Sequence, residues 1–293
     1  MKHKQKMLGI LVVAMILPCI THAVPKVTSR EYKLLLDPNN FNYGTEASDV
    51  NRYFTQAKTV IENKISRTVT GTMGLDAQRE IRFYDTQGSC PLNSMGYSLR
   101  ERIENGAKEV TLKYRGYDHY ITDFEDLSSS VAGAKTKFED DITRKDNLGL
   151  LVAASKSTTV STTRTLNDFE DINTLFTGFK NNYSFSNTQA LQVVSGLTIY
   201  ERKYAGPSID LGEFDADIEL SLWYTQMPYS GLKPAVAEVS FKYADANGNY
   251  TKKVVSRAAL SFAALKTLTQ FNASSSTATK TQFVYDYQSG FCQ

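Results

Sequence analysis

Residues 97–115 read YSLRERIENGAKEVTLKYR and change character at nearly every step. Such alternation is typical of β-strands, in which successive side chains face opposite ways. It predicts strands over 97–103 and 110–115, and the Asn105-Gly106 pair between them favours a hairpin. The basic residues of each strand then share one face. Arg100 and Arg102 do so on the first strand, and Lys113 and Arg115 on the second.

Further predicted strands also carry charges on alternate positions: Glu31 and Lys33; Lys137, Glu139 and Asp141; Asp215, Asp217 and Glu219; Glu238 and Lys242. One interpretation turns these faces to solvent, where mixed signs form cross-strand ion pairs. The other turns them inward in a closed sheet. Such a lumen would hold phosphate oxygens on Arg and Lys, and a divalent cation on carboxylates.

The remaining pattern predicts an α+β chain dominated by antiparallel sheet. Apolar residues at helical spacing predict helices over 48–65 and 166–179, and a third helix is expected from Ser256 to Phe271. Other strands are expected over 31–36, 81–85, 137–142, 197–204, 215–224 and 235–243, with a returning strand over 250–255 and a last one over 283–285. Residues 154–165 fit a linker or an extended strand.

The N-terminus predicts a cleaved export signal over 1–23. Lys2, Lys4 and Lys6 precede an apolar run over 7–17, which is too short to span a bilayer, and small residues end at Ala23. We therefore expect a secreted or periplasmic protein that is outside the membrane after cleavage, with one domain over 24–293. Cys90 and Cys292 would then remain, and an oxidising compartment favours a disulfide between them.

Charge and histidine content exclude several functions. Without the three leader lysines, 30 basic residues face 31 acidic ones, so the mature net charge is −1, and a nucleic-acid binder is not expected. Only His119 lies beyond the leader, which excludes His-rich zinc centres.

Four segments resemble the CYTH family, also called triphosphate tunnel metalloenzymes. Glu31-Tyr32-Lys33 is similar to the end of its Glu-x-Glu-x-Lys signature, and 137–141 and 237–241 are similar to two later acidic strands. The more specific likeness is a series in family order, consisting of Phe83-Tyr84-Asp85-Thr86, Leu99-Arg100-Glu101-Arg102 and Val110-Thr111-Leu112-Lys113-Tyr114-Arg115.

This resemblance implies an antiparallel β-barrel, or tunnel, of about eight strands with flanking helices. It also implies a Mg²⁺- or Mn²⁺-dependent phosphohydrolase acting on a triphosphate or polyphosphate. The phosphate-binding residues would be Lys33, Arg100, Arg102, Lys113, Arg115 and Arg202, with Lys203 as the alternative to Arg202. The metal ligands would be Glu31, Glu139, Asp141, Glu238, Asp217 and Glu219, of which Glu31 and Glu139 would be catalytic.

Two departures keep a second function open. Ser29 and Ser240 stand where the family has glutamates, and each loss weakens a hard-cation site. The alternative is a tunnel that binds a polyanion without turnover. A third alternative, an exported barrel with its charges facing solvent, requires Arg100, Lys113 and Glu139 to point outward. The sequence indicates neither the particular substrate nor an oligomeric state.

Overall fold

The computed structural model describes residues 25–145, 149–273 and 279–293, so the predicted leader lies outside the described residues. The helices are α1 (Glu46–Ile65), α2 (Pro91–Ser94), α3 (His119–Phe124), α4 (Phe169–Leu175), α5 (Thr177–Asn182), α6 (Lys252–Leu265) and α7 (Lys280–Asp286). The strands are β1 (Ser29–Leu36), β2 (Val69–Thr70), β3 (Gly74–Asp85), β4 (Tyr97–Glu104), β5 (Ala107–Gly116), β6 (Lys135–Lys145), β7 (Gly149–Ser161), β8 (Gln192–Val193), β9 (Ile199–Ala205), β10 (Ser208–Asp210), β11 (Asp215–Tyr224) and β12 (Val236–Ala244).

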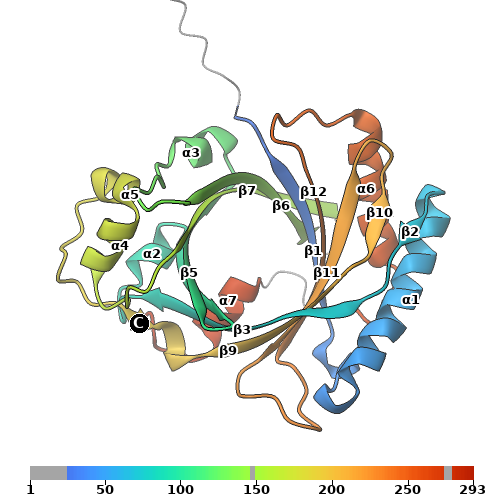
Figure 1. Ribbon diagram of the computed structural model, residues 1–293, viewed down its shortest axis with the longest axis horizontal. Coiled ribbons are helices and arrows are strands. Elements are labelled where there is room, and N and C mark those ends of the chain that lie inside the picture. Colours follow the sequence, from blue (N-terminus) through green and yellow to red (C-terminus); the bar gives the residue numbers. More distant parts are fainter. Residues whose placement is uncertain (1–24, 146–148, 274–278) are drawn as a thin grey trace, which may run out of the picture.

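Nine of the described strands close into a barrel, seen as a ring in Figure 1. Their order is β12-β1-β6-β7-β5-β4-β3-β9-β11, and β11 pairs back with β12. Neighbours run antiparallel except β1 and β6, which are parallel. The predicted α+β barrel is therefore confirmed in outline, with one more strand than the expected eight and one parallel contact.

The hairpin predicted from residues 97–115 is confirmed. β4 and β5 pair from Tyr97 with Tyr114 to Glu104 with Ala107. Asn105 and Gly106 form the turn with φ angles of 50° and 79°, the left-handed region that a two-residue hairpin needs. Of the Ser- and Thr-rich stretch over 154–165, the residues up to Ser161 belong to β7, which supplies the additional strand.

The main apolar clusters lie outside the barrel. Figure 1 shows α1 and α6 beside β11 and β12, and α2, α4 and α5 on the opposite side. Val50, Tyr53 and Ile61 of α1 pack with the outer faces of β1, β11 and β12. Phe169, Ile172 and other residues of α4 and α5 cover the outer faces of β4, β5 and β7. Because apolar side chains are buried by these helices, the alternate strand positions face the lumen.

Two sequence predictions near the C-terminus are wrong. The expected strand over 250–255 and the helix start at Ser256 are replaced by α6, because the Thr251 hydroxyl caps the helix and accepts from the Val254 N–H. The expected strand over 283–285 is α7, capped in the same way by Thr279. In both places β-branched or aromatic residues in the first turns of a helix resemble a short strand.

The single helix expected over 166–179 is two short helices, α4 and α5. The break falls at Phe176, which has a φ of −127° and a ψ of 83°, and its ring stays buried in the apolar cluster. Within the described residues, no helix combines the length and apolar character that a bilayer crossing requires.

Candidate functional site

The barrel encloses a cavity of about 450 Å³ that carries an excess of basic side chains. Its lining has twelve basic residues, which are Lys33, Arg79, Arg100, Arg102, Lys113, Arg115, Lys135, Lys137, Arg144, Lys203, Lys242 and Lys280. It has six acidic residues, which are Glu31, Glu109, Glu139, Glu201, Glu219 and Glu238. The inward orientation of Arg100, Lys113 and Glu139 removes the alternative with charges facing solvent. A lumen with this excess attracts anions.

Arg100 and Arg102 project from β4 into the lumen, and neither forms an ion pair with another described residue. Their Nε atoms are buried and make no hydrogen bond within the described part of the chain. Burial, and then the charge of Arg102, lowers the pKa of Arg100 to about 9, while the carboxylates of Glu201 and Glu109 act on it only through space. The guanidinium is still cationic at neutral pH, so the pair is a desolvated positive site that an anion would stabilise.

A second group of cations surrounds one carboxylate. Lys33 Nζ lies 2.6 Å from Asp141 Oδ1, and Lys113 Nζ and Arg115 Nη2 lie 2.8 and 2.6 Å from Asp141 Oδ2. Burial would raise the pKa of Asp141, but these three cations hold it well below its usual range. Lys33 also lies 2.9 Å from Glu31, and the pKa of Glu31 is lowered despite its burial. Much of the positive charge here is already compensated.

The wall formed by β9, β11 and β12 carries three glutamates, each with a cationic partner. Glu201 accepts from the Trp223 indole N–H at 2.9 Å and from Arg79 at 3.2 Å. Glu219 lies 3.3 Å from the Lys203 ammonium, and Glu238 lies 2.9 Å from the Lys280 ammonium. Protein ammonium and guanidinium groups thus already hold these carboxylates.

The predicted divalent-metal site does not fit this donor set. No group of three or more Asp, Glu, His or Cys side chains suited to a metal occurs among the described residues. Glu31, Asp141, Glu219 and Glu238 are all paired with Lys or Arg. A hard cation needs several oxygen ligands at once, and these oxygens face ammonium groups.

Two predicted site residues lie elsewhere. Arg202 points to the outer face of β9, where its Nε donates to Glu46 at 2.5 Å and its guanidinium lies over the Tyr43 ring. The choice of Arg202 was therefore wrong, and its neighbour Lys203 faces the lumen. Asp217 is exposed near the start of β11 and does not line the cavity. The Arg202 result follows from strand parity, since one step along a strand reverses the face. Asp217 shares a face with Glu219, but it lies too near the start of β11 to reach the cavity.

Sequence reasoning missed Arg79, Glu201 and Lys280. Arg79 shares a strand face with Ile81 and Phe83, but the predicted strand began at Ile81, whereas β3 begins at Gly74. Glu201 lay within a predicted strand with apolar residues on both faces, so alternation did not identify the inward side. Lys280 was outside every predicted element. A longer β3 in the prediction would have found Arg79 by parity alone.

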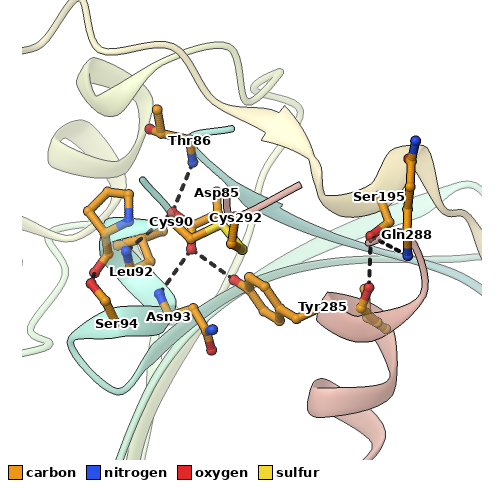
Figure 2. The surroundings of a disulfide bond; sticks show 12 residues. Asp85, Thr86, Cys90, Leu92, Asn93, Ser94, Ser195, Tyr285, Gln288 and Cys292 are labelled. Carbon is orange, nitrogen blue, oxygen red and sulfur yellow. Dashed lines mark hydrogen bonds between the residues drawn. A yellow bond between two sulfur atoms is a disulfide. The ribbon is translucent and has the colours of Figure 1, made fainter. Parts of the chain in front are cut away.

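One end of the cavity is bordered by apolar residues and α7. Phe83 and Trp223 line the cavity and cluster with Val284, Tyr285 and Phe291 from the C-terminal segment. The predicted disulfide joins Cys90 to Cys292, confirming that pairing (Figure 2). Asp85 lies beside it, accepting from the Asn93 N–H at 2.9 Å and the Tyr285 hydroxyl at 3.0 Å (Figure 2).

The fold and lumen define a class: a closed β-tunnel with charge inside and helices outside, the architecture implied by the CYTH resemblance. No family model matches the sequence, and no curated protein matches it. A candidate adenylate cyclase from Bacillus halodurans is 12% identical, and the match covers 90% of this chain and 100% of that one at a TM-score of 0.41. A candidate adenylyl cyclase from Hippeastrum, described as having a dominant triphosphatase activity, is 11% identical, with 89% and 97% covered and a TM-score of 0.42. Because these TM-scores are low, the description of a tunnel rests on the strand pairing of this chain and not on these neighbours.

Proposed function

We propose that the tunnel binds a linear phosphate anion, a triphosphate-bearing small molecule or polyphosphate, through its basic wall. The observation that carries the proposal is the Arg100–Arg102 pair, two lumen guanidiniums without a bonded counter-ion within the described residues. A second support is the two-to-one excess of basic over acidic side chains in the lining of a chain that is nearly neutral overall. Phosphate oxygens match guanidinium in charge and in fork geometry.

Calorimetric titration with tripolyphosphate in EDTA tests this proposal. We expect saturable binding to the wild type, and a loss of at least about tenfold in affinity for the Arg100→Gln/Arg102→Gln variant, since charge-assisted hydrogen bonds are lost. Arg52→Gln, at an exposed position on α1, is the matched control and should bind as the wild type does. Equal affinity in the double variant and the wild type would reject the site.

Metal-dependent hydrolysis is the second candidate function, and Glu139 favours it. This glutamate is 8% exposed and lines the lumen, and among the predicted ligands in that lining it alone has no ion pair with another described residue, so only here could a metal or a water bind without displacing a Lys or Arg. Phosphate release from tripolyphosphate with Mg²⁺ or Mn²⁺, lost in Glu31→Ala and Glu139→Ala, would establish turnover. If the wild type releases no more phosphate than these variants, hydrolysis is rejected and binding remains the proposed function.

We further propose that the protein acts outside the cytosol, in a secreted or periplasmic location. The Cys90–Cys292 bridge supports this, because structural disulfides persist in oxidising compartments. Mass analysis of the exported fraction should find a mature chain beginning near Val24, whereas an uncleaved cytosolic chain would contradict export.

A further inference from the structure

Lys280 contacts one of the carboxylates that the sequence assigned to metal. Its Nζ lies 2.9 Å from Glu238 Oε1 and 2.8 Å from Ser221 Oγ, and it lies 5.0 Å from the centre of the Trp223 ring. The Glu238 side chain is 8% exposed and the Lys280 side chain 23% exposed, so the pair is shielded from bulk water. Separating such a pair leaves a poorly solvated charge, which is costly.

The position of Lys280 is fixed by what holds α7. Val284 and Tyr285 are buried, and the Tyr285 hydroxyl donates to Asp85. The Ser195 hydroxyl donates to the Val284 carbonyl at 3.0 Å. The disulfide then ties the chain end to the segment before α2. A lysine at the start of this anchored helix loses less freedom on pairing than a lysine on a loose tail.

A divalent cation at Glu238 would meet this ammonium directly. The two positive groups cannot share one carboxylate oxygen at contact distance without strong repulsion. The antiparallel partners of Glu238 across β1 and β11 are Leu35 and Ser221, neither of which is acidic, and Lys280 also acts on the nearby carboxylate of Glu201. The Lys280 ammonium already contacts Glu238, so it would have to move before a divalent cation could bind this carboxylate.

We propose that Lys280 is a built-in counter-cation that occupies the metal position at Glu238 and gives the tunnel a fixed positive charge at the end bordered by α7. Polyanion binding then does not require a divalent cation at this carboxylate. The statement about polyanion binding rests on the proposed function. The statement that Lys280 occupies the metal position at Glu238 does not.

Trp223 provides a direct probe, because it is the only tryptophan in the chain and lies beside Lys280. Paramagnetic Mn²⁺ bound at Glu238 would quench its fluorescence. We expect no saturable quenching in the wild type and saturable quenching in Lys280→Met. The effect should be absent in Lys280→Met/Glu238→Gln and in Lys280→Arg, which keeps the charge. Lys252→Met, at an exposed position on α6, is the matched control and should behave as the wild type does.

The same variants separate the proposal from the function. Saturable quenching of the wild type that disappears in Glu238→Gln would overturn it, as would a folded Lys280→Met that Mn²⁺ does not quench. In tripolyphosphate titrations with EDTA, Lys280→Met should bind roughly tenfold more weakly than the wild type, and part of the loss should be restored when Mg²⁺ replaces the EDTA. If no variant binds tripolyphosphate, the proposed function fails while the Mn²⁺ result still decides the role of Lys280.

Discussion

Glu201 is a lumen residue whose ionised form is stabilised by its neighbours in the folded protein. Burial would raise its pKa, but Lys280, Arg102, the Trp223 N–H and Arg79 together lower the pKa to about 2. An acid with a lowered folded pKa stabilises the fold above its unfolded pKa, and that contribution is lost as pH falls towards the folded pKa.

Glu201→Gln should therefore lower stability at pH 6, by about 3 kcal/mol if the whole pKa difference is expressed. The difference from the wild type should shrink as pH falls from about 4.3 towards 2, where the wild-type carboxylate becomes protonated. Urea unfolding of both proteins across this range measures the difference. A difference that grows on acidification would mean that Glu201 is not stabilised as a carboxylate.

Residue-level prediction succeeded where alternation was clean and failed where it was not. In β4 and β5 one face is apolar, so Arg100, Arg102, Lys113 and Arg115 were placed in the lumen from parity. In β9, Tyr200 and Tyr204 face the helices while Ile199 faces the lumen, so both faces are partly apolar. Sequence alone could not then choose between Arg202 and Lys203.

At the scale of elements, the anchored C-terminal segment is the part that sequence patterns described least well. Residues 283–285 of α7 resemble a strand, and the position of the helix depends on Cys90, Asp85 and Ser195, which lie at least 85 positions before its first residue. A cysteine count predicts the bridge but not the orientation of the helix that it anchors. The contact between Lys280 and Glu238 therefore could not be predicted from the sequence.

The Cys90→Ser/Cys292→Ser variant should be less stable than the wild type by about 2–4 kcal/mol, because the bridge closes a long loop of the unfolded chain. Its barrel should remain folded, since the helix-covered clusters do not include the cysteines. Denaturant titration, with far-ultraviolet circular dichroism for the barrel, measures both. Unchanged stability would show that the bridge does not constrain the chain.

Across the whole molecule, polarity is arranged with the main apolar packing outside the barrel and charge within it. Helices α1 and α6 cover one side and α2, α4 and α5 the other, which frees the inner faces of nine strands for polar side chains (Figure 1). The near-neutral net charge of the chain conceals a basic interior surface. Alternating charges in the sequence predicted this arrangement, whereas the pairing of carboxylates with lysines from other strands and from α7 required the closed barrel.

The most direct test of phosphate binding in the tunnel is to locate a phosphate-like anion by X-ray diffraction. Crystals of the mature protein soaked in tungstate should give an anomalous peak in the lumen within hydrogen-bonding distance of Arg100 and Arg102, and that peak should be absent from the Arg100→Gln/Arg102→Gln variant. Peaks confined to the outer surface, with an empty lumen, would contradict the account.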